Sequence, residues 1–304
     1  MRFSFLVIVL IAGAVNSSFG QWQQCNGTAN LNFQSLITNG IYNFAGGETG
    51  VYLSTDAAEN YTSSNQGNDS VGPTRGFAKD DTYVYTCTSQ GVFRSGDNGN
   101  TWEQKSDGIT NPLTSGMIHA NSMLFVVGTK GVFKSADHGD TWSGGGLSSV
   151  DVRCITAIQD TLYVGTDGKG VFKSTDWGAT WKAVNNSLFS TKVRAIQSKG
   201  NTLFAGGQPA TGLFRSTDFG ATWKLLAGGL PSDAYRGFAC NDELIVAGTF
   251  GGGVYYSLDN GDTWRAINEG LTDLTIFDLA LNDGYIVAAT NTQGVFRFPL
   301  SAIK

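Results

Sequence analysis

The chain has 304 residues, of which 41 are glycine and 5 are proline, and only 15% carry a charged side chain. This composition excludes a collagen-like, disordered or long-helix protein and indicates a globular fold rich in turns. Its 20 basic and 25 acidic residues give a formal charge of -5, which argues against a nucleic-acid-binding protein and against one held on anionic membranes by its overall charge.

The first 20 residues have the pattern of a secretory signal peptide. Arg2 precedes an apolar run from residue 3 to residue 15, and the small residues Ser18 and Gly20 stand before the expected cleavage point. The run is shorter than the roughly 20 residues that a membrane-spanning helix needs. We therefore expect residues 1–20 to be removed and residues 21–304 to form one exported domain, secreted or, in a bacterium, periplasmic, without a transmembrane segment.

One short pattern recurs along the rest of the chain. Its copies start at a glycine, and successive starts are 39 to 42 residues apart: Gly50, Gly91, Gly131, Gly170, Gly212, Gly253 and Gly294. Each repeat contains four short segments rich in β-branched and aromatic residues, with Gly, Asp and Asn between them. Four short strands in about 40 residues predict a β-propeller with one four-stranded sheet, or blade, per repeat.

The two ends of the chain complete the count of blades. The last repeat stops before its fourth strand, whereas the segment after residue 20 begins with an isolated Trp22. Trp22 then belongs to a set of seven aromatic residues at the same spacing: Trp22, Tyr61, Trp102, Trp142, Trp181, Trp223 and Trp264. We predict an all-β, seven-bladed propeller of four-stranded blades, closed by an N-terminal strand that pairs into the last blade and leaves no open edge.

The recurring S-x-D-x-G-x-T-W sequence resembles the Asp box, or BNR repeat, of sialidase, sortilin-type and photosystem II assembly-factor propellers. The resemblance extends over essentially all of residues 21–304 and implies the propeller fold. It implies no single function, because these families include hydrolases, receptors and assembly factors. In them the boxes lie on the rim, away from the substrate face.

The repeated aspartates are predicted to be structural, although their number suggests a metal or catalytic role at first sight. Aspartate accepts hydrogen bonds from backbone N–H groups in tight turns, glycine allows a positive φ, and tryptophan buries a large apolar surface. Every blade needs such a turn, whereas a catalytic pair is needed once. The five aspartates of the complete copies are Asp97, Asp137, Asp176, Asp218 and Asp259.

The cysteines and histidines do not predict a chemical site. The four cysteines fall in four different predicted blades, so we expect no intrachain disulfide, with Cys25 accessible and the others packed as small apolar residues. His119 and His138 are the only histidines and occupy different parts of their blades. This placement argues against a zinc site or a Ser-His-Asp triad, and we predict neither a metal nor a cofactor.

Four arginines share one position of the first strand of their repeats. They are Arg75, Arg153, Arg194 and Arg236, and the other repeats have Asn32, Ser115 and Asp278 at the aligned place. The innermost strands of a propeller line its central channel, so we expect the four guanidinium groups to meet at one mouth. Guanidinium binds carboxylate, sulfate or phosphate through two parallel hydrogen bonds. The first strands are also similar to those of the photosystem assembly-factor family, whose arginine patch contacts a protein partner.

These residues favour a monomeric, non-catalytic binding or scaffold protein that recognises an acidic protein segment or an anionic glycan. Aromatic residues of the turns, such as Trp177 and Phe219, would let a lectin stack sugars. A structural alternative is that the arginines tie neighbouring blades together, with Asp151, Asp233 and Asp273 neutralising them.

An enzymatic alternative is a sialidase- or xyloglucanase-like glycoside hydrolase that uses two carboxylates, with Asp278 facing Asp151. The sequence lacks the Arg-Ile-Pro string and the six blades that are typical of sialidases.

Overall fold

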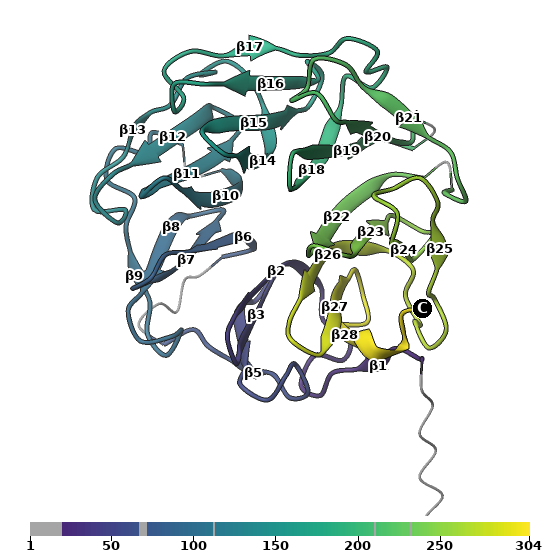
Figure 1. Ribbon diagram of the computed structural model, residues 1–304. Coiled ribbons are helices and arrows are strands. Elements are labelled where there is room, and N and C mark those ends of the chain that lie inside the picture. The colour runs from purple at the N-terminus through teal and green to yellow at the C-terminus, as the bar shows by residue number, and fades with distance from the viewer. Residues whose placement is uncertain (1–19, 67–71, 112, 210, 232) are drawn as a thin grey trace, which may run out of the picture.

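The computed structural model describes residues 20–66, 72–111, 113–209, 211–231 and 233–304, so the predicted signal peptide lies outside it except for Gly20. Its strands form seven antiparallel sheets of four strands each, arranged as a ring (Figure 1). The predicted seven-bladed propeller is therefore confirmed. In the described part of the chain, no helix has the length and apolar character to cross a membrane.

The strands follow the chain from the centre of the ring outward in each blade. Blade one contains β2 (Phe33–Asn39), β3 (Tyr42–Gly47), β4 (Gly50–Ser54) and β5 (Thr62–Ser63). Blade two contains β6 (Thr74–Lys79), β7 (Val84–Thr88), β8 (Gly91–Ser95) and β9 (Glu103–Gln104). Blade three contains β10 (Thr114–Ala120), β11 (Met123–Gly128), β12 (Gly131–Ser135) and β13 (Ser143–Gly144). Blade four contains β14 (Val152–Ile158), β15 (Thr161–Thr166), β16 (Val171–Ser174) and β17 (Lys182–Ala183).

The remaining blades keep the same order. Blade five contains β18 (Val193–Lys199), β19 (Thr202–Gly207), β20 (Leu213–Ser216) and β21 (Lys224–Leu226). Blade six contains β22 (Tyr235–Cys240), β23 (Ile245–Thr249), β24 (Val254–Ser257) and β25 (Arg265–Ala266). Blade seven contains β26 (Ile276–Leu281), β27 (Tyr285–Thr290) and β28 (Val295–Pro299), with β1 (Gln23–Gln24) as its fourth strand. A short 3-10 turn, Leu300–Ala302, follows.

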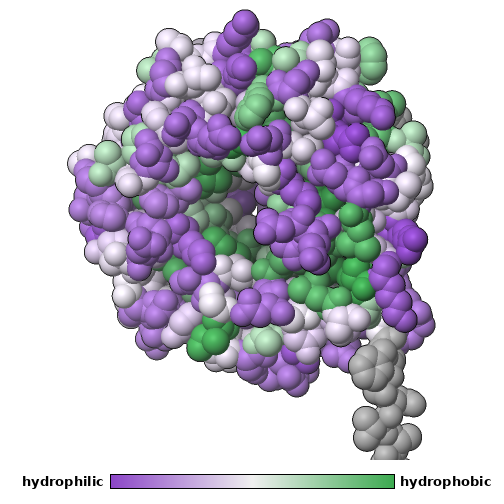
Figure 2. Space-filling model, viewed as in Figure 1, coloured by the Kyte–Doolittle hydropathy of each residue, from purple (hydrophilic) through white to green (hydrophobic). Residues whose placement is uncertain are grey.

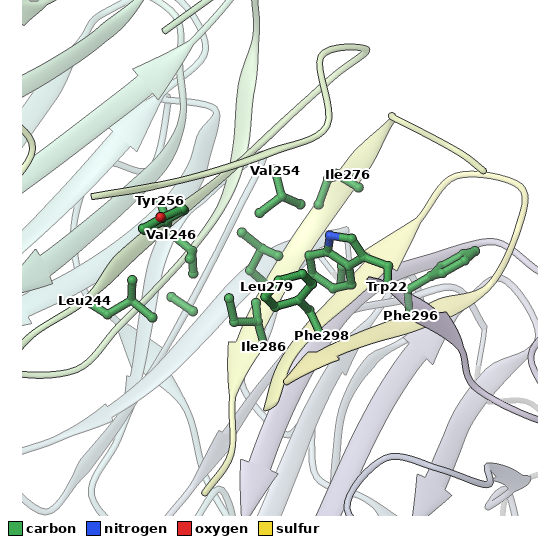
Figure 3. Close-up of a cluster of buried hydrophobic side chains, with 12 residues drawn as sticks. Trp22, Leu244, Val246, Val254, Tyr256, Ile276, Leu279, Ile286, Phe296 and Phe298 are labelled. Carbon is green, nitrogen blue, oxygen red and sulfur yellow. The ribbon is translucent and has the colours of Figure 1, made fainter. Parts of the chain in front are cut away.

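The N-terminal strand closes the ring as predicted. β1 pairs antiparallel with β28, with Gln23 opposite Arg297. The neighbouring Trp22 is 4% exposed and its indole N–H donates to the carbonyl of Ile267 in blade six. Figure 3 shows the Trp22 ring among Phe298, Leu279 and Ile286. One side chain thus joins blades six and seven, which hydrogen bonds within a single sheet cannot do.

The repeated turns lie between the third and fourth strands and are held by the same hydrogen bonds in each complete copy. In blade three the Ser135 hydroxyl donates to Asp137 Oδ1 at 2.7 Å, and the Thr141 N–H and hydroxyl donate to the two carboxylate oxygens of Asp137 at 2.9 and 2.6 Å. These donors, the Thr141 hydroxyl first, lower the pKa of Asp137 to about 2. The carboxylate is therefore satisfied within its own turn, and the predicted structural role is confirmed.

The four cysteines all carry free thiols. The expectation that Cys25 is accessible is wrong, because its side chain belongs to the buried apolar cluster between blades seven and one, with Val295 and Phe33, and is 2% exposed. Burial raises the pKa of the Cys25 thiol to about 12. The Cys25 thiol is thus held in its unreactive, protonated form.

Candidate functional site

Every innermost strand has a β-bulge near its start. In β14 the register passes from Val152 opposite Thr166 to Cys154 opposite Gly165, so Arg153 is the extra residue. The same shift occurs in the other six inner strands. A bulge redirects the side chain of its extra residue, and the seven extra residues are Gln34, Arg75, Ser115, Arg153, Arg194, Arg236 and Phe277.

These seven residues all line one cavity in the middle of the ring. The central cavity has a volume of about 630 Å³ and receives residues from all seven inner strands. Figure 2 shows the molecule hollowed at this point, with apolar residues inside the hollow. The bulges lie at the beginnings of the inner strands, the end at which the chain enters each blade. The four predicted arginines are therefore brought together at one mouth of the cavity.

Two of the aligned positions were wrong by one or two residues. In blade one the bulged residue is Gln34, whereas Asn32 lies before the strand and donates its side-chain N–H to Asn291 Oδ1 at 2.9 Å. In blade seven the bulged residue is Phe277, and Asp278 follows it. The bulged residue is arginine in four of the inner strands, and the two errors fall in strands that lack this marker.

Arg153 and Arg194 are held by two carboxylates. Arg153 Nη2 lies 2.5 Å from Asp151 Oδ2 and 3.3 Å from Asp167 Oδ2. Arg194 Nη2 lies 2.9 Å from the same oxygen of Asp167. Asp167, in the β15–β16 connection, thus links blades four and five, as the structural alternative requires. The sequence alignment missed Asp167 because the residue belongs to another part of the repeat.

Arg236 has a different environment. No carboxylate among the described residues forms an ion pair with it, and its guanidinium carbon lies 4.8 Å from the centre of the Phe250 ring and 5.8 Å from that of Phe277. Burial, followed by the positive charges of Arg194 and Arg153, lowers the pKa of Arg236. Asp151 and Asp167 pair with Arg153 and Arg194, so Arg236 is the one cation of the three without an ion-pair partner among the described residues, and an anion beside it is favourable.

Of the four arginines at the bulges, Arg75 is the second that has no carboxylate partner in the described part of the chain. It is exposed and donates from Nη1 to Gln34 Oε1 at 2.9 Å. Asp233 and Asp273, which were expected to neutralise the arginines, form no ion pair with Arg75 or Arg236. Asp233 accepts from the N–H of Ala234, and Asp273 accepts from the N–H groups of Thr275 and Thr292.

Asp278 is the single carboxylate among the described residues that line the central cavity. Its two oxygens accept the N–H of Leu36 in blade one at 2.8 Å and the N–H of Leu279 at 2.9 Å. Burial raises the pKa of Asp278 to about 7, although these two donors oppose the rise. Asp151 pairs with Arg153 and is not among the lining residues. The pair of facing carboxylates expected for a glycosidase is therefore not assembled.

His138 and Trp177 each have a partner within the fold. No cluster of three or more His, Cys, Asp or Glu side chains suited to a metal occurs among the residues that the structure describes. His138 Nδ1 lies 2.9 Å from Asp80 Oδ2. Trp177 stacks on Phe125 with ring centres 6.2 Å apart, which favours turn packing over a sugar-stacking rim.

Comparison with known proteins agrees with the fold. The model of the DUF6242 beta propeller domain matches residues 117–243, which is less than half of the chain. No curated protein sequence matches the chain. Among solved structures, YCF48 bound to D1 peptide has a TM-score of 0.76 at 11% identity, with 92% of this chain and 97% of that chain covered.

Two other similar structures belong to larger proteins. The extracellular domain of a one-component system from B. thetaiotaomicron has a TM-score of 0.75 at 14% identity, with 91% of this chain and 40% of that chain covered. The GH74 xyloglucanase from Xanthomonas campestris has a TM-score of 0.69 at 14% identity, with 93% and 54% covered. Identities this low establish a shared fold and leave function to the residues of the site.

Proposed function

We propose that this propeller is a non-catalytic binding module that holds an anionic ligand, an acidic protein segment or an anionic glycan, at the mouth of its central cavity. The observation that carries the proposal is the environment of Arg236: a partly buried guanidinium beside two further arginines, with no carboxylate partner in the described structure. A carboxylate or sulfate there would give the Arg236 guanidinium the anionic partner that the described residues do not supply.

Unpartnered polar atoms around the arginines support the proposal. Of the seven buried side-chain nitrogen and oxygen atoms that have no hydrogen-bond partner among the described residues, four belong to Asp151, Arg153, Asp167 and Arg236. Buried polar groups are rarely left without a partner. The Nε–H donors of Arg153 and Arg236 fit an anion, whereas the carboxylate oxygens of Asp151 and Asp167 only accept hydrogen bonds and fit ordered water. Arg236 and Arg75 would contact the anion directly. Asp151 and Asp167 would fix the orientation of Arg153 and Arg194.

The comparisons and the carboxylate count favour binding over hydrolysis. YCF48 is a propeller solved with a bound peptide, and its likeness covers nearly all of both chains. The xyloglucanase shares the fold, but glycoside hydrolysis generally requires two carboxylates, and the described lining of the cavity offers only Asp278. We also propose that residues 1–20 are a signal peptide and that the monomeric domain works outside the cytoplasm. N-terminal sequencing of the exported protein tests the cleavage.

Binding of two anionic probes tests the proposed function. A fluorescent oligoglutamate peptide and a sulfated oligosaccharide are titrated with the protein at several salt concentrations, and anisotropy is measured. We expect affinity for at least one probe that falls as salt rises, and a loss of about tenfold or more in Arg236→Ala. Arg265→Ala, in the outermost strand β25, is the matched control. Binding that is equal in Arg236→Ala and the wild type, or no binding of either probe, would contradict the proposal.

A further inference from the structure

Next to Arg236 the cavity mouth has an apolar surface, which we call the ledge: Phe250, Leu274 and Phe277. Phe250 lies between β23 and β24 of blade six, Leu274 precedes β26, and Phe277 is the bulged residue of β26. Phe250 is 42% exposed and Leu274 is 39% exposed. Large apolar side chains that are exposed on adjoining connections indicate a contact surface for a partner.

The ledge is held in place before any ligand binds. The Phe250 N–H donates to the carbonyl of Ala234 at 2.8 Å, and the N–H groups of Gly251 and Gly253 donate to the carbonyl of Leu274 at 3.1 and 2.9 Å. The rings of Phe250 and Phe277 pack edge to face with centres 5.9 Å apart. The ledge therefore spans blades six and seven as one fixed surface, and a ligand would not need to order it.

The same phenylalanines position the arginine. The guanidinium of Arg236 lies against Phe250 and Phe277, which leaves the edge of the guanidinium, with its N–H donors, to bind an anion. An anionic group that meets this edge would bring the atoms next to it within reach of the Phe250 ring, and the connection that contains Phe250 is joined to Leu274 by backbone hydrogen bonds. The site therefore has two adjoining parts, one cationic and one apolar.

Resting on the proposed function, we infer that the partner is a peptide segment in which an acidic residue stands next to a large apolar residue. The acid binds Arg236, and the apolar side chain covers Phe250 and Leu274. A sulfated glycan carries the anion but no apolar side chain, and would leave the ledge in water. Charge complementarity and apolar burial together thus favour a peptide.

Two peptides of equal charge separate the two parts of the site. One contains Glu-Phe and the other Glu-Ser within the same Gly/Ser sequence, and a sulfated oligosaccharide is the third probe. We expect the wild type to bind the Glu-Phe peptide about tenfold more tightly than the Glu-Ser peptide, which is the typical effect of one apolar contact. The double variant Phe250→Ser with Leu274→Ser should lose this preference and bind the two peptides with equal affinity, which is also weakened because Phe250 packs on Arg236.

The matched control is Phe189→Ser, because Phe189 is 80% exposed in another connection between blades and lies outside the ledge. It should keep the preference, and all variants should melt at the wild-type temperature. Equal affinity of the wild type for both peptides, a preference that survives in the double variant, or tighter binding of the oligosaccharide would overturn the inference while leaving the proposed function intact. If Arg236→Ala binds every probe as the wild type does, the proposed function itself fails.

Discussion

The outer turns and the inner bulges each repeat one backbone geometry from blade to blade. The side chains of the turns are nearly constant, whereas those of the bulges vary. The five complete turns have the same Ser, Asp, Gly, Thr and Trp, and their carboxylates accept the same hydrogen bonds. The seven bulges have four different residue types, namely Arg, Gln, Ser and Phe. Uniform side chains build the turns of five blades, whereas varied side chains at the equivalent bulges make one side of the cavity cationic and apolar. Stability and recognition are therefore expected to respond to different substitutions.

The largest effect on folding is expected at the tryptophans of the turns. Trp142 is 5% exposed and its indole N–H donates to the carbonyl of Lys105 in blade two at 2.9 Å. Trp142→Ala should lower the free energy of unfolding by about 3–5 kcal/mol, as measured by chemical denaturation. Arg75→Ala, at an exposed bulge, should change it by less than about 0.5 kcal/mol. Equal destabilisation by the two substitutions would remove the distinction between turn and bulge.

Asp278 is expected to make stability fall as pH rises. In the folded protein its pKa is raised from 3.8 to about 7 by burial, so the folded state binds the proton more tightly than the unfolded state. The stability that this proton gives is complete below about pH 4 and is lost as pH rises through 7. The melting temperature of Asp278→Asn minus that of the wild type should therefore be more positive at pH 8 than at pH 4. Asp160→Asn, in an exposed hairpin, is the control, and parallel curves for Asp278→Asn and the wild type would refute this expectation.

The turn aspartates should show the opposite sign. The pKa of Asp137 is lowered to about 2, first by the Thr141 hydroxyl, so its contribution to stability is present above about pH 4 and is lost as pH falls towards 2. Asp137→Ala should cost about 1–3 kcal/mol at pH 7, because it removes the acceptor of several hydrogen bonds. The cost should shrink on acidification. A cost that is independent of pH would mean that the ionised carboxylate contributes nothing.

The smallest effect is expected in blade one, whose turn departs from the pattern of the five complete copies. Tyr61 replaces tryptophan there, and its hydroxyl is buried without a hydrogen-bond partner among the described residues. Tyr61→Phe should therefore raise the free energy of unfolding by about 1 kcal/mol. Tyr235→Phe is the contrasting variant, because the Tyr235 hydroxyl donates to the carbonyl of Pro231 at 2.8 Å, and it should destabilise. Loss of stability in both variants would show that the Tyr61 hydroxyl has a partner.

The repeats made the fold predictable, because seven equally spaced aromatic residues fix the number of blades and Trp22 fixes the closure. The common position of Arg75, Arg153, Arg194 and Arg236 was predictable for the same reason. The state of each arginine was not. It depends on Asp167 and on Phe250. Both residues lie in the connection between the second and third strands of their blades, which the alignment of first strands did not include. Phe277 escaped notice because an apolar residue at a bulge resembles an ordinary strand residue.

The pairing of β1 with β28 sets the order in which the domain can be completed. Gln23 lies opposite Arg297, so the earlier of these two segments waits for one that is made about 270 residues later. Contacts between residues so far apart in the chain form slowly. Until they form, blade seven lacks its outer strand and blade six lacks the indole of Trp22. A ribosome-bound chain therefore exposes an incomplete sheet edge, and protection by chaperones would matter most during this interval.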